Sequence, residues 1–140
     1  MDWEKNLIKE FEHWKVYLYH SQYYLGRVYL WAKREDALDL FEISEGEKRE
    51  YFVIGKRVKE ALDELFNPDL YNYITMNNET PHLHTHIIPR YQGKRTFDGI
   101  EFEDKRWGKI YFPYDTEFKI PDNTFNKIRT LLSKSLEDEK

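Results

Sequence analysis

The stretch that decides the fold of this chain is His82-Leu83-His84-Thr85-His86, which runs on into Ile87-Ile88-Pro89-Arg90. Side chains two residues apart point to the same face of a β-strand. A strand at this place therefore puts three imidazoles in one row and turns Leu83 and Thr85 to the opposite face. Imidazole titrates near neutral pH and can act as a nucleophile, a hydrogen-bond donor or a metal ligand. The row therefore predicts a functional site on one face of a sheet.

The segments around the row alternate between strand and helix patterns. Ser44 and Glu47 have the spacing of a capping box, and the apolar spacings of three and four that follow predict a long helix over 44–66. Strand patterns occupy 14–20, 27–32, 71–76 and 82–88, and the last two form a hairpin-like unit. We expect residues 2–13 to be helical, residues 91–121 to be irregular, and a last helix to begin near Asp122 or Asn123.

The composition excludes several classes of function. The 140 residues are the length of one domain (1–140), and the formal net charge of −4 argues against a nucleic-acid partner. The absence of cysteine excludes disulfides, thiolate nucleophiles and cysteine zinc sites. No apolar run reaches membrane-spanning length and the N-terminus does not resemble a signal peptide, so we expect a soluble cytoplasmic protein with no membrane partner.

The stretch 78–91 resembles the signature of the histidine triad (HIT) superfamily, His-φ-His-φ-His-φ-φ, in which φ is apolar. Thr85 departs from the pattern at one apolar position. Asn77 stands where prokaryotic hydrolases of the family often carry glycine. The order of strands and helix also matches over a core of 14–91, which leaves 92–140 as a C-terminal extension. The patterns and the resemblance together predict an α+β fold, with an antiparallel sheet of about five strands, one long helix packed on it and a C-terminal helix.

The resemblance implies a nucleotide hydrolase or nucleotidyl transferase that acts at the α-phosphate. The substrate would be a dinucleoside polyphosphate or a nucleoside phosphoramidate. His84 would be the nucleophile and would form a covalent nucleotidyl-histidine, which water then hydrolyses. The carbonyl of His82 would accept the inner N–H of His84, the side chain of His82 would hold the neighbouring geometry, and His86 would donate to the phosphate oxygens.

Two further residues are candidates for phosphate contacts. Asn78 matches a family asparagine that donates to the phosphate, and Thr80 is close enough in sequence to donate to a bridging oxygen. The resemblance also implies a homodimer related by a two-fold axis. No tightly bound cofactor and no metal ligands are expected, although a polyphosphate substrate would arrive with Mg²⁺ bound through its own oxygens.

One departure keeps alternatives open. Many family members carry a further histidine within Pro-Lys-x-His, whereas this chain has Glu35 at that place. Glu35 could accept a hydrogen bond from a triad histidine but cannot donate to phosphate. A nucleotide-binding sensor or scaffold with little turnover therefore stays an alternative, as does a three-histidine metal site with an open position. For Arg90, a structural salt bridge and a substrate contact are equally good interpretations.

Overall fold

A computed structural model describes residues 3–137 of the chain. The elements, in chain order, are the 3-10 helix η1 (Trp3–Asn6), the strands β1 (Leu7–Glu10), β2 (Trp14–Leu18) and β3 (Val28–Ala32), the 3-10 helix η2 (Leu40–Glu42), the helix α1 (Glu45–Phe66), the strands β4 (Leu70–Ile74), β5 (His84–Arg90), β6 (Lys94–Phe97) and β7 (Ile100–Glu103), and the helix α2 (Asp122–Ser135). No helix among these residues is long and apolar enough to cross a membrane.

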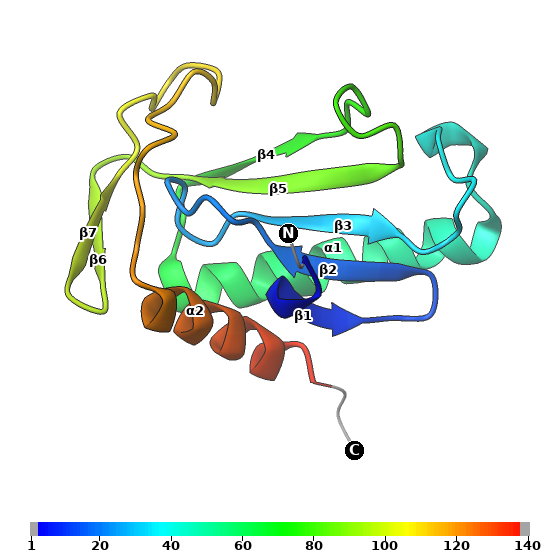
Figure 1. Cartoon of the computed structure of the whole chain (residues 1–140), viewed down its shortest axis with the longest axis horizontal. Helices are drawn as coiled ribbons and strands as arrows, with labels where there is room; N and C mark the ends of the chain where they lie inside the picture. The colour runs from blue at the N-terminus through cyan, green and yellow to red at the C-terminus, as the bar shows by residue number, and fades with distance from the viewer. Residues whose placement is uncertain (1–2, 138–140) are drawn as a thin grey trace.

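Five strands form an antiparallel sheet in the order β1-β2-β3-β5-β4, and α1 runs along one side of it (Figure 1). The strands β6 and β7 form a separate hairpin at one end of the sheet. The expected α+β fold is therefore confirmed, including the pairing of β4 with β5. The opposite face of the sheet, which neither α1 nor α2 covers, is called the open face below.

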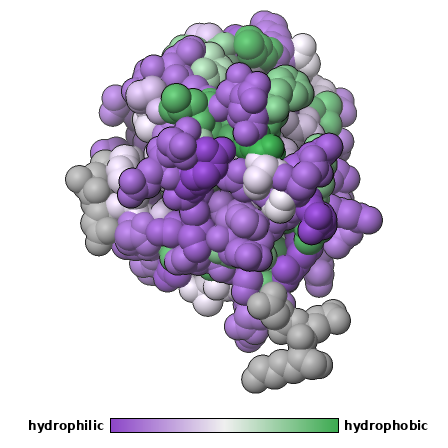
Figure 2. Space-filling view, turned by 90° about the vertical axis from the view of Figure 1, so that its right-hand side faces the viewer, coloured by the Kyte–Doolittle hydropathy of each residue, from purple (hydrophilic) through white to green (hydrophobic). Residues whose placement is uncertain are grey.

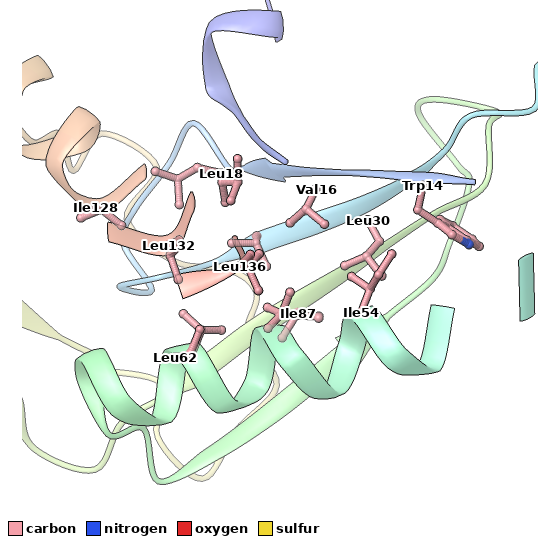
Figure 3. Close-up of a cluster of buried hydrophobic side chains, with 14 of the residues drawn as sticks. Trp14, Val16, Leu18, Leu30, Ile54, Leu62, Ile87, Ile128, Leu132 and Leu136 are labelled. Atoms are coloured by element: carbon pink, nitrogen blue, oxygen red, sulfur yellow. The ribbon is translucent and has the colours of Figure 1, made fainter. Parts of the chain in front are cut away.

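The core lies between the sheet and the two helices (Figure 3). Ile54 and Leu62 of α1 point toward Val16, Leu30 and Ile87 of the strands. The C-terminal helix adds a second apolar row over the neighbouring part of the sheet, formed by Ile128, Leu132 and Leu136. All of these side chains are buried, so alternate residues of each strand belong to the core and the others face outward.

The capping box predicted for the long helix is present. The Ser44 hydroxyl accepts from the Glu47 amide, and the Glu47 carboxylate accepts from the Ser44 amide at 2.8 Å. The helix ends at Asn67, which adopts a left-handed conformation with φ of 48° and donates to the Asp63 carbonyl. Both ends of the helix therefore have partners for their backbone groups.

The expected helix over 2–13 is wrong. Asp2 lies outside the described residues, η1 covers only Trp3–Asn6, and Leu7–Glu10 form β1, which pairs with β2. A short apolar segment fits a helical and an extended pattern equally well. The edge of β2 favours the extended form. Pairing with β2 gives the backbone N–H and C=O groups of 7–10 hydrogen-bond partners and lets Ile8 point into the core.

The expected irregular structure over 91–121 is wrong for its first part, because β6 and β7 form a hairpin there. Asp98 and Gly99 form the turn, with φ of 53° and 75°. Asp-Gly is a strong signal for a two-residue hairpin turn, because that turn needs positive φ at both positions. The last helix does begin at Asp122, with Pro121 as its N-cap residue in place of Asp122 or Asn123.

Gly26, which precedes β3, has φ of 87°, and a Cβ built there would lie 2.7 Å from Cδ2 of Leu62 on α1. We expect Gly26→Ala to destabilise the protein by about 2–4 kcal/mol, which combines left-handed strain with overpacking against the helix. The free energy of unfolding in urea measures this effect.

Gly93→Ala is the matched control. Gly93 has a similar φ of 89°, but nothing lies within 4 Å of a Cβ added there. It should therefore show the backbone strain alone, of about 1–2 kcal/mol. Equal losses in the two variants would show that Gly26 is not required for close packing.

Candidate functional site

The histidine row lies on the open face of the sheet. His84 and His86 belong to β5, and their partners on β3 are Trp31 and Tyr29. The sequence pattern predicts a strand from His82 onward. The strand β5 begins only at His84, so His82 lies just before it. The three histidines nevertheless remain neighbours, because the chain around His82 is held by the end of β3.

His82 is fixed by two contacts with β3. Its Nε2 lies 2.6 Å from the carbonyl oxygen of Ala32, and its ring stacks on Trp31 with centroids 4.3 Å apart. A carbonyl can only accept a hydrogen bond, so Nε2 of His82 carries the proton. The side chain of His82 is therefore engaged with the protein.

His84 is oriented by the backbone of His82. Its Nδ1 lies 2.6 Å from the His82 carbonyl oxygen, which is the contact that the resemblance implied. Since the carbonyl accepts, Nδ1 carries a proton, and Nε2 is the outward nitrogen, which holds the lone pair in the neutral ring. The ring is partly exposed and lines a cavity, and no described residue forms a hydrogen bond with Nε2.

His86 has the opposite arrangement. Its Nδ1 lies 3.4 Å from Nε and 3.3 Å from Nη2 of Arg27, both of which can only donate. Nδ1 is thus the acceptor, and Nε2 of His86 carries the proton. Burial, and then the charge of Arg27, lower the pKa of His86 to about 3, with smaller contributions from His84 and His20. At neutral pH His86 is therefore a neutral hydrogen-bond donor.

The polar residue that interrupts the apolar positions, Thr85, has partners on the other face of the sheet. It is buried and its hydroxyl lies 2.8 Å from the hydroxyl of Tyr51 and 2.6 Å from that of Thr75. These bonds remove the cost of burying a hydroxyl in the core. The departure from the family pattern therefore has a local structural cause.

The loop before the row carries the two candidates for phosphate contacts. Asn78 and Thr80 are exposed and line the same cavity as His84 and His86. Asn77 has φ of 54°, which asparagine tolerates better than most residues, and its side-chain amide donates to the Leu38 carbonyl. The position that is often glycine in the prokaryotic hydrolases thus needs a left-handed conformation here too.

The cavity has a volume of about 700 Å³, which is large enough for a nucleotide-sized ligand. Its aromatic floor comes from β2 and β3, through Tyr17, Tyr29 and Trp31. Three segments form its walls. The 77–80 loop is one, the N-terminal segment contributes Trp3 and Glu4, and the C-terminal segment contributes Tyr111, Phe112 and Tyr114.

Glu35 takes no part in this site. It is exposed, does not line the cavity, and has no hydrogen bond to any triad histidine, so the expected role as an acceptor is wrong. The metal alternative is also not supported by the geometry. In the part of the chain that the structure describes, no three side chains of histidine, cysteine or acid come together as a set that could hold a metal ion.

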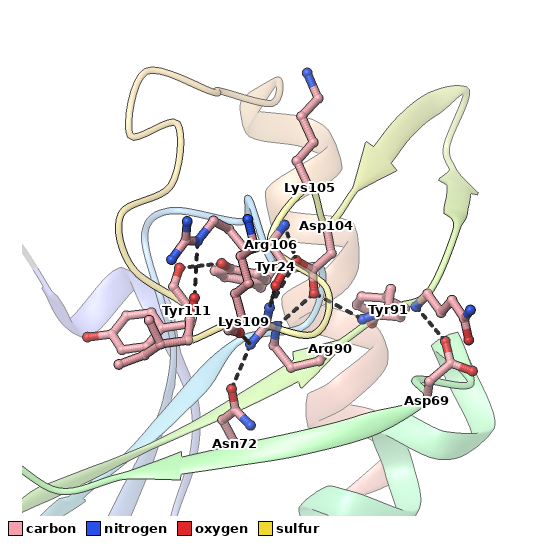
Figure 4. A network of polar contacts seen from close by, with 12 residues as sticks. Tyr24, Asp69, Asn72, Arg90, Tyr91, Asp104, Lys105, Arg106, Lys109 and Tyr111 are labelled. Atoms are coloured by element: carbon pink, nitrogen blue, oxygen red, sulfur yellow. Dashed lines mark hydrogen bonds and ion pairs between the residues drawn. The ribbon is translucent and has the colours of Figure 1, made fainter.

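Arg90 is structural. Its guanidinium is 3% exposed and binds Asp104 through two bonds of 2.7 and 3.1 Å. It also donates to Asn72 on β4 and to the carbonyls of Arg106 and Lys109 (Figure 4). These bonds hold residues 104–109 against the sheet, and so bring the chain that follows to the cavity.

Sequence reasoning missed several residues of the site. Three of them are two residues apart: Arg27 directly precedes β3, and Tyr29 and Trp31 belong to it. The strand period of two predicts that their side chains share one face. The sequence therefore contains the signal for a shared face. It does not contain the register that pairs β3 with the histidine strand β5. Tyr111 and Tyr114 reach the cavity through tertiary contacts alone, including the bond from the Tyr24 hydroxyl to the Tyr111 carbonyl.

Comparison with known proteins agrees with this geometry. The family model described as HIT domain matches residues 4–93. The search of curated proteins finds no match.

Solved structures share the fold at low identity. A histidine triad protein from Bradyrhizobium japonicum has a TM-score of 0.76 and 20% identity, over 96% of this chain and 93% of that one. A histidine triad protein from Sinorhizobium meliloti gives 0.77 and 16%, over 95% and 92%. A hypothetical histidine triad nucleotide-binding protein from Sulfolobus tokodaii gives 0.67 and 16%, over 93% and 82%.

The Arg90 network generates a prediction about stability. Arg90→Met leaves the buried carboxylate of Asp104 without its cation, and we expect a loss of about 3–5 kcal/mol in the free energy of unfolding. Arg95→Met is the control, because Arg95 pairs with the exposed Asp69 at 3.1 Å and should cost less than about 1 kcal/mol. Similar small losses in both variants would contradict a structural role for Arg90.

The burial of His86 generates a prediction about pH. The folded protein keeps His86 neutral down to about pH 3, whereas the unfolded chain binds a proton there near pH 6.5. Stability should therefore fall as the pH drops below 6.5, by up to about 1.4 kcal/mol per pH unit from this one group. Above pH 7 both states are neutral, and His86 adds no slope.

Urea unfolding of wild type and His86→Gln between pH 4 and 8 measures this difference. The variant should lose the His86 component of the acid slope and match the wild-type slope above pH 7. Parallel curves over the whole range would mean that His86 is not held neutral by the fold.

Proposed function

This chain belongs to the HIT domain family, which implies a nucleotide-binding hydrolase or transferase, and we propose that it cleaves nucleotides at the α-phosphate through a covalent nucleotidyl-His84 intermediate. The observation that carries this proposal is the state of the His84 ring. Its Nδ1–H is bound to the His82 carbonyl, which makes Nε2 the outward nitrogen of a ring that lines a cavity of about 700 Å³. A neutral imidazole in this state is a nucleophile at pH 7.

In the first step, Nε2 of His84 attacks the α-phosphorus and the bond to the leaving group breaks. The hydrogen bond to the His82 carbonyl stabilises the positive charge that develops on the ring. In the second step, water attacks the phosphorus, the P–N bond breaks and its electron pair returns to Nε2, while the proton that the water loses passes to the solvent. The products are a nucleoside monophosphate and a free enzyme.

His86 supports both steps as a donor. Its protonated Nε2 is available to the non-bridging oxygens of the α-phosphate, because Nδ1 is occupied by Arg27. Asn78 and Thr80 offer further donors from the loop at the cavity wall, and the aromatic residues of the floor offer faces on which a base can stack. His82 acts through position, since its carbonyl and ring both hold the neighbouring geometry.

The protein itself needs no tightly bound cofactor for this chemistry. A polyphosphate substrate would carry Mg²⁺ on its own oxygens, because Mg²⁺ is held mostly by substrate phosphates in such sites.

We further propose that the protein is a homodimer. The strand β4 is an edge of the sheet, and the large apolar side chains Leu70 and Tyr73 on it are 44% and 57% exposed. On α1, Phe52 and Val53 are 67% and 52% exposed. An exposed edge strand with apolar neighbours is a ready surface for a second copy. Figure 2 shows apolar surface gathered among hydrophilic residues on the right-hand side of the view in Figure 1.

The covalent intermediate can be tested directly. Incubation with an α-³²P-labelled dinucleoside polyphosphate, followed by rapid quenching, should leave acid-labile label on the wild-type protein. His84→Ala should show no label and a loss of turnover of about 10⁴-fold or more, because removal of a nucleophile abolishes the step. His13→Ala is the control, since His13 packs against Gly46 at the start of α1 and should behave as wild type.

Two results would contradict the proposal. Full turnover in His84→Ala would show that another group is the nucleophile. Nucleotide binding by wild type with neither label nor turnover, across adenylyl and guanylyl substrates, would favour a sensor or scaffold.

The dimer is tested by light scattering of the eluted protein. Phe52→Glu places a charge in the proposed interface and should yield a monomer. Ile110→Glu changes a side chain that is also 69% exposed but lies in the C-terminal segment, so it should remain a dimer. A wild-type monomer, or dissociation in both variants, would contradict the proposed interface.

A further inference from the structure

Arg27 is a buried cation with no carboxylate partner. The residue is 5% exposed, none of the described acids forms an ion pair with it, and its Nη1 has no hydrogen-bond partner. It contacts Nδ1 of His86 and the face of Tyr19, whose ring centre lies 3.9 Å from the guanidinium carbon, and the rings of Tyr111 and Tyr114 lie further away, at 5.3 and 6.0 Å. Burial of an unpaired charge is costly, and an acceptor nitrogen and aromatic rings offset only part of the cost.

The place of Arg27 is as informative as its lack of a counter-ion. It lies immediately before β3, two residues from Tyr29, and so on the face that carries Tyr29 and Trp31, the partners of His86 and His84. It therefore continues the line of the two histidines, and it lines the same cavity. The other lysine or arginine of that cavity, Lys15, is already paired with Glu4 at 3.4 Å.

The chemistry of the leaving group adds a second constraint. An amine can leave phosphorus only if it gains a proton, whereas a phosphate can leave as an anion if a positive charge stabilises it. The attacking Nε2 of His84 cannot also be the acid, and burial and the charge of Arg27 lower the pKa of His86, so that it is neutral. Glu35, which stands in place of the family's further histidine, is exposed and outside the cavity.

We propose that Arg27 is the cation of an anion subsite for the leaving group, and that it makes the site selective for substrates in which a phosphate or polyphosphate leaves the α-phosphorus. This inference rests on the proposed function and names its substrate class. When the Pα–O bond breaks, the electron pair stays on the bridging oxygen, and the charge that forms there lies in the field of Arg27. No proton needs to be transferred to the leaving group.

Binding tests the subsite without any need for turnover. Inorganic tripolyphosphate, which has no nucleoside, should bind wild type, and Arg27→Gln should weaken its binding by about 10- to 100-fold, because a close contact between opposite charges is lost. Glutamine can still donate to Nδ1 of His86, and loss of an unpaired buried charge should leave the thermal midpoint unchanged or higher. Lys15→Gln, which changes the paired cation of the cavity, should weaken binding by less than about threefold.

Turnover tests the selectivity. For wild type, kcat/KM on diadenosine tetraphosphate with Mg²⁺ should exceed that on an adenosine phosphoramidate with an alkylamine leaving group. Arg27→Gln should lower the first value by about 10²-fold or more and the second by less than about tenfold, because only the first leaving group departs as an anion.

The outcomes separate this inference from the proposed function. Equal binding of tripolyphosphate by wild type and Arg27→Gln, or equal losses on both substrates, would overturn the anion subsite and leave the His84 intermediate in place. Weak binding in Arg27→Gln together with no nucleotidyl label in wild type would keep the subsite and overturn the enzyme.

Discussion

The hydrogen bond from Nδ1 of His84 to the carbonyl of His82 is the interaction on which the site depends. It fixes the proton on the inner nitrogen and leaves the outer one free, so it decides whether the ring can act as a nucleophile. The bond forms within three residues, but it needs the backbone of His82 to stay in place. The Ala32 carbonyl and the Trp31 ring hold His82 there, so the end of β3 fixes the geometry at the start of β5.

One face of the sheet forms the hydrophobic core, and the other carries the candidate site. On one face, the strands pack against α1 and α2, and even Thr85 is bonded within that layer. On the other face, the same strands present histidines and aromatic rings to a cavity. Because residues alternate, each strand serves both layers at once. The hydrogen bonds of Arg90 hold the segment that leads to Tyr111 and Tyr114, which form one wall of the cavity.

Local signals in the sequence predicted the elements that local physics determines. The capping box of Ser44 and Glu47 marked the start of α1, and the histidine spacing marked the row. The strand β1 was missed because four residues fit two patterns, and the edge of β2 decides between them. The β6–β7 hairpin was missed although Asp98-Gly99 carries its turn signal.

The contacts that give the site its character could not be predicted in this way. Arg27 meets His86 across 59 residues of sequence, and only the register of β3 against β5 brings them together. The same holds for the tyrosines of the C-terminal segment, which depend on Arg90 and Asp104. For Glu35 the sequence suggested a contact that the fold does not make. Its match to a family position suggested a hydrogen bond to a triad histidine, but Glu35 is exposed and lies outside the cavity.

The most direct measurement of the central claim is ¹⁵N NMR of the histidine rings in the protein at pH 7. The account predicts a proton on Nδ1 of His84, and a neutral His86 ring whose proton is on Nε2. Arg27→Gln should leave the His84 tautomer unchanged. A bare Nδ1 at His84, or a proton on Nδ1 of His86, would contradict the account.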